Sequence, residues 1–319
     1  MNAFLTRAGW ADAAREPLAG DASARLYTRL RRADGTAILM QDPGGDVSLF
    51  ARLAAHLNDL GLSAPRILAR DDAGGLLLLE DLGDGLVARL ATDPVREAEL
   101  YRIAVDALVK LHRHAAPADL PEATPDHMAS ITQLAFSHYA ARPEAAAPAI
   151  DALRAILADT AAATDVMVLR DYHAENILLL PQRSGAARAG LLDFQDALRG
   201  HRAYDLVSLL RDVRRDLFPG TAETAIAHYL RATGTEEAPF RAAMAALGVQ
   251  RNLRILGVFA RLAAEYGKPR YLCLLPRVWA HLQTDLAHPA LSPLRRHLDS
   301  MPPPSLAPLA RPEPACQMP

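Results

Sequence analysis

The sequence predicts an α+β fold of two lobes, in which a small lobe built on an antiparallel β-sheet precedes a larger, mainly helical lobe. Three observations lead to this prediction. Short apolar runs separated by polar turns fill roughly the first quarter of the chain, and apolar residues at helical spacing dominate the remainder. A glycine-containing acidic segment, 80–85, separates the two parts. With 319 residues, half of them apolar, the chain is long enough to bury a core in each lobe.

The small lobe is expected to contain two β-hairpins with a helix between them. The first hairpin joins strands at 24–32 and 36–40 through an Ala-Asp-Gly turn. Apolar residues then recur at helical spacing in 47–60. The second hairpin joins strands at 66–70 and 76–79 through a turn that contains two glycines.

The larger lobe is expected to follow a hinge near residues 80–84. We therefore assign residues 1–82 to the first lobe, 83–300 to the second and 301–319 to a disordered, proline-rich tail. The Ala- and Pro-rich run 140–148 is interpreted as a surface connection. Helices are predicted at 94–111, 206–217, 221–232, 240–246, 251–266 and 276–286.

Composition narrows the possible partners. The formal net charge is −2, and charges of both signs are interspersed, which gives no reason to expect nucleic acid or an anionic membrane as a partner. Cys273 and Cys316, the only cysteines, make neither a disulfide framework nor a zinc site. Residues 1–20 lack the apolar core of a signal peptide, so a cytoplasmic location is expected. The oligomeric state stays open.

Asp171, Asn176 and Asp193 carry the strongest chemical signal. Asp171 and Asn176 lie between two apolar runs that read as strands, and Asp193 follows a third such run after a turn. Phosphoryl transfer needs a carboxylate to take the proton of the acceptor hydroxyl, and hard oxygen ligands to hold Mg²⁺ against nucleotide phosphates. The pattern therefore predicts a small-molecule kinase that uses ATP and Mg²⁺, with Asp171 as base and with Asn176 and Asp193 as metal ligands. The alternative is that these side chains merely cap turns and a helix.

The expected nucleotide-binding features of the small lobe are incomplete. Small residues at 20–25 can approach phosphate oxygens, with Ser23 and Arg25 as further donors. A kinase places a lysine on its third strand, but Met40 occupies that position here, and the chain has no lysine before Lys110. There are three possible explanations. An arginine, of which Arg25 and Arg29 are nearest, neutralises the phosphate charge in place of the lysine, or Mg²⁺ does more of that work. The third is that the protein is catalytically inactive.

Several polar residues near the motif are candidates for supporting it. Asp205, in the first turn of a helix, can accept backbone N–H groups and stabilise the catalytic loop. His173 is expected to hold the shape of that loop. Asp196 adds a carboxylate near the metal or the acceptor. The charged residues of the following segment either face solvent or line an acceptor pocket; they are Arg211, Asp212, Arg214 and Arg215.

The sequence resembles the aminoglycoside phosphotransferase-like kinase superfamily, whose members have a two-lobe, protein-kinase-like fold. The resemblance is carried by Asp171 to Asn176, by Leu191-Leu192-Asp193-Phe194-Gln195-Asp196 and by Asp205-Leu206. It is closest to the branch of bacterial N-acetylmuramate and N-acetylglucosamine anomeric kinases of cell-wall recycling. The further fragments are Gly20-Asp21-Ala22-Ser23, Gly190, Ala197, residues 204–210, 257–261 and 267–272. Two departures from the wider superfamily are Leu169-Arg170 before Asp171 and the absent strand lysine.

This resemblance implies transfer of phosphate from ATP to the anomeric hydroxyl of the sugar, giving the sugar 1-phosphate in peptidoglycan recycling. It implies that backbone groups of Glu80, Asp81 and Leu82 contact adenine, with Met40 nearby. The expected sugar contacts are Tyr172, His173, Glu175, Asp196, Arg211, Asp212 and Arg215.

Other interpretations remain at this stage. Another small-alcohol kinase, for an aminoglycoside, choline or homoserine, would share the motif. A nucleotide-binding pseudokinase would keep the fold and transfer nothing. A hydrolase built on Asp171 and His173 lacks a nucleophile in the sequence.

Overall fold

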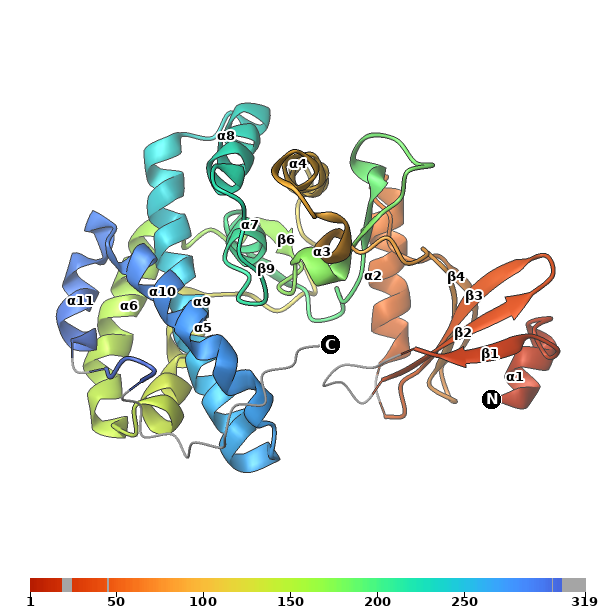
Figure 1. Cartoon of the computed structure of the whole chain (residues 1–319), viewed down its shortest axis with the longest axis horizontal. Coiled ribbons are helices and arrows are strands. Elements are labelled where there is room, and N and C mark those ends of the chain that lie inside the picture. The colour runs from red at the N-terminus through yellow and green to blue at the C-terminus, as the bar shows by residue number, and fades with distance from the viewer. Residues whose placement is uncertain (19–24, 45, 300, 306–319) are drawn as a thin grey trace. The chain divides into compact units, whose positions relative to one another are not determined.

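A computed structural model describes residues 1–18, 25–44, 46–299 and 301–305, drawn in Figure 1. The chain forms two compact units. Unit 1 consists of Met1–Leu111 with Ala174–Asp196, and unit 2 of His112–His173 with the chain from Ala197 onward. The predicted α+β fold, with an antiparallel sheet and a larger helical part, is confirmed. The lobe boundary expected near residues 80–84 stays a prediction, as does the division of functions between the two lobes.

Unit 1 is built on a five-stranded antiparallel sheet in the order β1-β2-β3-β5-β4. The two predicted hairpins are β2–β3 and β4–β5, whereas β1 was not predicted. Leu30 pairs with Ala37, and Leu39 with Leu78, which places their side chains on one face of the sheet. The strands are β1 (Ala14–Pro17), β2 (Leu26–Arg32), β3 (Gly35–Gln41), β4 (Ile67–Asp71) and β5 (Leu76–Glu80).

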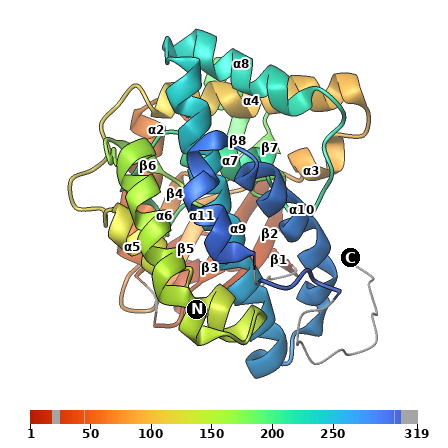
Figure 2. The same cartoon turned by 90° about the vertical axis from the view of Figure 1, so that its left-hand side faces the viewer.

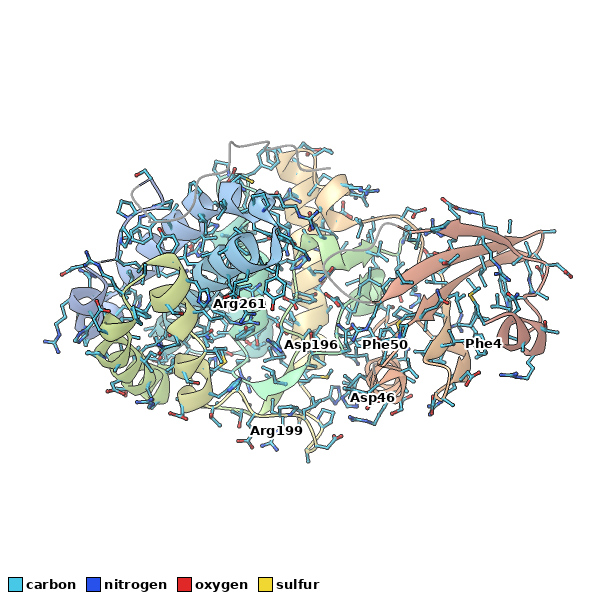
Figure 3. The ribbon with its side chains drawn as sticks, turned by 90° about the horizontal axis from the view of Figure 1, so that it is seen from below. Phe4, Asp46, Phe50, Asp196, Arg199 and Arg261 are labelled. Atoms are coloured by element: carbon cyan, nitrogen blue, oxygen red, sulfur yellow. The ribbon has the colours of Figure 1, made fainter. Side chains whose placement is uncertain are left out.

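A short helix that the sequence analysis did not predict, α1 (Asn2–Arg7), packs on this sheet. Phe4, labelled in Figure 3, and Leu5 join the buried cluster that includes Leu30 and Leu39. The Arg32 guanidinium lies 4.0 Å from the centre of the Trp10 ring, just after the helix. Burial of the apolar sheet face therefore needs the N-terminal segment.

The predicted helix between the hairpins is confirmed as α2 (Val47–Asp59). The Asp46 carboxylate caps it by accepting the backbone N–H groups of Ser48 at 2.9 Å and Leu49 at 3.0 Å. On its buried side the Phe50 ring lies 4.8 Å from the ring of Phe194, and Figure 3 labels both Asp46 and Phe50. This contact anchors the segment that carries Asp193.

Unit 1 also contains the hairpin expected around the motif. Ile177 pairs with Leu191, and Leu191 donates its backbone N–H to the Ser63 carbonyl at 2.8 Å. The strands predicted on either side of the turn are thus confirmed. The remaining elements of unit 1 are α3 (Val87–Leu90), α4 (Pro94–Leu111), η3 (Ala174–Asn176), β7 (Ile177–Leu179), η4 (Gly185–Arg188) and β8 (Ala189–Leu191).

Unit 2 is arranged around a 30-residue helix, α9 (Glu237–Tyr266), against which α6, α10 and the π-helix η1 pack (Figure 2). None of the described helices is both long and apolar enough to cross a membrane. The other elements of unit 2 are α5 (Pro125–Ser130), η1 (Ala135–Tyr139), η2 (Pro143–Ala145), α6 (Ala146–Thr160), β6 (Val166–Val168), β9 (Leu198–Gly200), α7 (Tyr204–Leu210), α8 (Thr221–Thr233), η5 (Pro269–Leu274), α10 (Leu275–Leu286), η6 (Pro289–Leu291) and α11 (Ser292–Leu298).

Three sequence predictions about unit 2 are wrong. The helices expected at 240–246 and 251–266 are one helix, because Gly248 provides room for the Asp285 carboxylate and does not end the helix. The helix expected at 206–217 ends at Leu210, because Asp212 accepts the backbone N–H of Arg214 at 3.1 Å in a turn. The expected surface connection at 140–148 already contains the first turn of α6.

Gly257 allows α9 to approach the backbone of η1, and replacing it with alanine is expected to destabilise unit 2. A Cβ atom there would lie 2.3 Å from the backbone carbon of Leu134 and 2.5 Å from the nitrogen of Ala135. Because backbone atoms cannot rotate away, we expect a loss of about 3 kcal/mol and a melting temperature lower by about 5 °C or more. Differential scanning calorimetry measures both. Ala264→Ser, which adds one heavy atom at an exposed position of α9, is the matched control. An unchanged melting temperature would contradict this close approach.

Candidate active site

The segment with Asp171 belongs to unit 2, and Asn176 and Asp193 belong to unit 1, so each group is described within its own unit. Asp171 follows the buried strand β6, which pairs with β9. The residue before it, Arg170, has a positive φ of 71°, a conformation that is costly for a residue with a side chain. Such strain persists only where neighbouring groups hold the backbone in place.

Three side chains hold the backbone of Arg170. The Asp205 carboxylate accepts the N–H groups of Leu169 at 2.7 Å and of Arg170 at 3.0 Å. Ser208 and Arg251 both donate to the Arg170 carbonyl, at 3.0 Å and 3.2 Å respectively. The predicted support of the loop by Asp205 is therefore confirmed. Because the N–H and the carbonyl group of Arg170 are both held, the backbone position of the following residue, Asp171, is fixed as well.

Buried titratable groups surround this loop. Complete burial raises the pKa of Asp205 to about 7, against the opposing effect of its two backbone hydrogen bonds. Burial, followed by the nearby positive charge of Arg214, lowers the pKa of His173 to about 4. At neutral pH, His173 is therefore a neutral imidazole beside Asp171.

Asn176 and Asp193 lie together in unit 1. The Asn176 amide nitrogen donates to Oδ2 of Asp193 at 3.4 Å, and Gln195 donates to the other carboxylate oxygen, Oδ1, at 2.7 Å. Asp193 has a positive φ of 56°, so its backbone, like that of Arg170, is in an uncommon conformation.

This pair fits a magnesium ion. Mg²⁺ is usually held by about one or two carboxylates, with phosphate oxygens and water completing its shell. A half-turn of the Asn176 amide presents its oxygen beside Oδ2 of Asp193. Within the described ranges, no cluster of three or more His, Cys, Asp or Glu side chains could hold a metal ion.

The arginines near the missing lysine have different surroundings. Nε of Arg25 lies 2.8 Å from Oδ2 of Asp42. Burial opposes its charge, but the Asp42 hydrogen bond and nearby charges, including Asp193, raise the pKa of Arg25 overall. Arg25 therefore lies in the field of the expected metal ligand. Ser23, the other predicted phosphate donor, lies outside the described residues.

Arg29 binds the expected hinge instead. Its side chain is 6% exposed, and it contacts Asp81 at 2.8 Å and Asp84 at 2.8 Å. Asp81 also accepts the backbone N–H of Gly83 at 2.9 Å. Glu80 is held by Arg183 at 2.6 Å. The segment expected to contact adenine is thus held by Arg29 and Arg183, and the guanidinium of Arg29 is engaged there.

Replacing Arg29 with Gln is expected to weaken ATP binding. The change leaves the buried carboxylate of Asp81 without its guanidinium partner, so the hinge segment loses its fixed geometry. We expect KM for ATP to rise about 10-fold or more, with kcat within about threefold, as measured by steady-state kinetics. Arg31→Gln is the control, because Arg31 lies on the same strand and its side chain is 50% exposed. An unchanged KM would contradict a role for Arg29 in nucleotide binding.

The predicted sugar contacts divide between the two units. Tyr172 and His173 are buried in unit 2, whereas Glu175 and Asp196, the latter labelled in Figure 3, are exposed in unit 1. Met40 is fully buried in β3. That Met40 and Leu82 contact the nucleotide stays a prediction. The charged candidates in unit 2 are engaged by neighbours: Arg211 with Asp285 at 3.0 Å and Asp212 with Arg214 at 3.2 Å, while Arg215 makes further contacts of its own.

The sequence analysis missed Arg251 and Arg254. Both lie on α9, three residues apart and therefore on one face. Arg251 reaches the loop through the Arg170 carbonyl, and Arg254 lies close enough to Asp171 to be affected by its charge. Their signal in the sequence was weak: two arginines within a mainly apolar run that was predicted to be helical.

Comparison with known proteins decides the family. The family model described as "Phosphotransferase enzyme family" matches residues 14–244. The chain belongs to this family. Solved structures confirm the fold: a choline/ethanolamine kinase family protein from Mesorhizobium loti superposes with a TM-score of 0.63, at 18% identity, covering 93% of this chain and 99% of that one. A macrolide 2′-phosphotransferase from Brachybacterium faecium gives a TM-score of 0.58 at 17% identity, covering 91% and 95%.

Curated relatives are more similar in sequence. An N-acetylmuramate/N-acetylglucosamine kinase from Caulobacter vibrioides is 39% identical over 342 residues, covering 93% of this chain and 94% of that protein. A protein of the same name from Pseudomonas aeruginosa is 31% identical, covering 90% and 88%.

Proposed function

We propose that this phosphotransferase transfers phosphate from ATP to the anomeric hydroxyl of N-acetylmuramate and N-acetylglucosamine, giving sugar 1-phosphates in peptidoglycan recycling. The observation that carries the proposal is the 39% identity to the Caulobacter vibrioides kinase of that name over nearly the whole of both chains. Phosphoryl transfer needs a base and oxygen ligands for Mg²⁺, and Asp171, Asn176 and Asp193 have the side chains for these roles. A cytoplasmic location, where ATP is available, is part of the proposal.

Asp171 is proposed to act as the base. Its carboxylate accepts the proton of the anomeric hydroxyl while the hydroxyl oxygen forms a bond to the γ-phosphorus of ATP. The bond between that phosphorus and the bridging oxygen breaks, and ADP leaves with the bonding electrons. Because an anomeric hydroxyl is more acidic than other sugar hydroxyls, the base has less to do, and positioning and charge neutralisation carry more of the catalysis.

Asn176 and Asp193 are proposed to hold Mg²⁺, which neutralises phosphate charge when it is bound. Their contact at 3.4 Å and the Gln195 hydrogen bond support this assignment. Arg25, paired with Asp42 and in the field of Asp193, is proposed to replace the missing lysine at the phosphates. Backbone groups of Glu80 to Leu82 are proposed to contact adenine.

A coupled ADP-release assay with ATP and Mg²⁺ tests the proposal. The acceptor panel contains N-acetylmuramate, N-acetylglucosamine, glucose, choline, homoserine and kanamycin, and phosphorus NMR identifies any product. We expect turnover on the two N-acetyl sugars and a sugar 1-phosphate signal. ADP release with a different acceptor alone would replace the amino sugar by that acceptor within the same family. No release with any acceptor, while ATP still binds, would favour a pseudokinase.

A further inference from the structure

Arg254 differs from several other arginines of unit 2. It lies half-buried in the middle of α9, and among the residues that the structure describes it makes no hydrogen bond or ion pair. Arg251, one turn earlier, donates to the Arg170 carbonyl at 3.2 Å. Arg211 and Arg277 are paired with Asp285 at 3.0 Å and with Asp216 at 2.7 Å. The guanidinium of Arg254 is therefore a partly buried cation with no acceptor among the described residues.

The charges near Arg254 are mainly positive. Burial, and then the positive charges of Arg170 and Arg251, lower the pKa of Arg254, whereas Tyr204 and Asp171 act in the opposite direction. Of the charged groups that act on Arg254, two are cations and one, Asp171, is a carboxylate. A cation in such surroundings is unfavourable unless an anion pairs with it. The anion is expected to come from a ligand.

The position of Arg254 favours an anionic group on the acceptor. Arg254 belongs to unit 2 together with Asp171, the residue proposed to take the proton of the acceptor hydroxyl. The cation near the expected metal ligand is a different one, Arg25 in unit 1. A planar guanidinium pairs with a carboxylate through two parallel hydrogen bonds, which fixes orientation as well as charge.

We propose that Arg254 binds the carboxylate of the sugar substrate, so that the site is built for a carboxylate-bearing sugar. This inference rests on the proposed function. N-acetylmuramate carries such a carboxylate on a lactyl ether, and N-acetylglucosamine has the same ring with a free hydroxyl instead. Arg251 keeps its contact with the loop and lies beside the bound group. The two sugars then differ in affinity mainly through Arg254.

The test compares the two sugars in one variant. Arg254→Gln removes the charge and keeps most of the side chain. With saturating ATP and Mg²⁺, we expect kcat/KM for N-acetylmuramate to fall about 10- to 100-fold and that for N-acetylglucosamine to stay within about twofold. Arg254→Lys restores part of the loss because it keeps the charge without the planar fork. Arg231→Gln, the same charge change at an exposed position of α8, is the control.

The possible outcomes separate this inference from its alternatives. An equal loss on both sugars would overturn it, because a contact with the phosphates, or misfolding, affects both substrates alike. An unchanged kcat/KM for N-acetylmuramate would overturn it as well. Calorimetric titration of N-acetylmuramate without ATP gives a second reading, in which Arg254→Gln binds about 10- to 100-fold more weakly. If the unaltered protein turns over neither sugar, the proposed function itself fails. Arg261, labelled in Figure 3, lies two turns further along α9 and is left unchanged in every variant.

Discussion

Asp171→Asn is expected to lower kcat by about 10²- to 10⁴-fold while ATP binding and the melting temperature stay unchanged. Asparagine has the same shape and cannot accept the proton of the acceptor hydroxyl. The loop itself is held by Asp205, Ser208 and Arg251, which contact the backbone of Leu169 and Arg170 and not the Asp171 carboxylate. The substitution therefore removes the base without releasing the strained backbone. Single-turnover kinetics with the preferred sugar measure the chemical step directly.

Asp165→Asn is the control for this experiment. Asp165 lies just before β6 and is paired with Arg202 at the surface, its side chain 50% exposed. Its replacement is expected to change kcat by less than about twofold. A kcat for Asp171→Asn that stays within a few-fold of the unaltered protein would mean that the acidic anomeric hydroxyl needs no base here. Loss of ATP binding together with kcat would instead point to a structural role for the carboxylate.

The sequence contained enough to predict four strands of the sheet, the α2 helix and the hairpin around Asn176 and Asp193. In these segments the period of the apolar residues agrees with the final structure, and turns of glycine and aspartate mark the ends. The errors share a cause. Gly248 reads as a helix break until its neighbour, Asp285, is known to occupy the space. The end of α7 depends on the side chain of Asp212, which competes with the helix for a backbone N–H group.

The site was predictable to different degrees. Residue type and spacing were enough to identify Asp171, Asn176 and Asp193 as candidates, and the position of Asp205 in a first turn indicated its support of the loop. Which arginine serves the nucleotide phosphates could not be decided from sequence, because Arg25 and Arg29 are both candidates to replace the missing strand lysine. In the structure Asp81 and Asp84 engage Arg29, which supports the proposal of Arg25 for the phosphates. Arg254 was out of reach of sequence reasoning, since it lies about 80 residues from Asp171 along the chain.

Asp193→Asn is expected to lower kcat by about 10³-fold and to raise the Mg²⁺ concentration needed for half-maximal rate. The change removes the only formal charge of the proposed magnesium pair, and an amide oxygen is a weaker ligand for a hard cation than a carboxylate oxygen. A loss of several kcal/mol of charge stabilisation corresponds to this factor. Initial rates over a wide range of Mg²⁺ concentration measure both quantities. Asp34→Asn, at an exposed turn of unit 1, is the control.

Gln195→Ala separates the charge of the proposed metal ligand, Asp193, from the orientation of its carboxylate, which Gln195 holds. Gln195 donates to Oδ1 of Asp193 at 2.7 Å, so its removal lets the carboxylate rotate but leaves its charge in place. We expect about a 10-fold loss of kcat, recovered in large part at high Mg²⁺, because the metal can reorient the carboxylate that the glutamine no longer holds. A loss in Gln195→Ala as large as that in Asp193→Asn would mean that the orientation of the carboxylate, and not its charge, limits the rate. A Mg²⁺ dependence unchanged in both variants would remove Asp193 from the metal site.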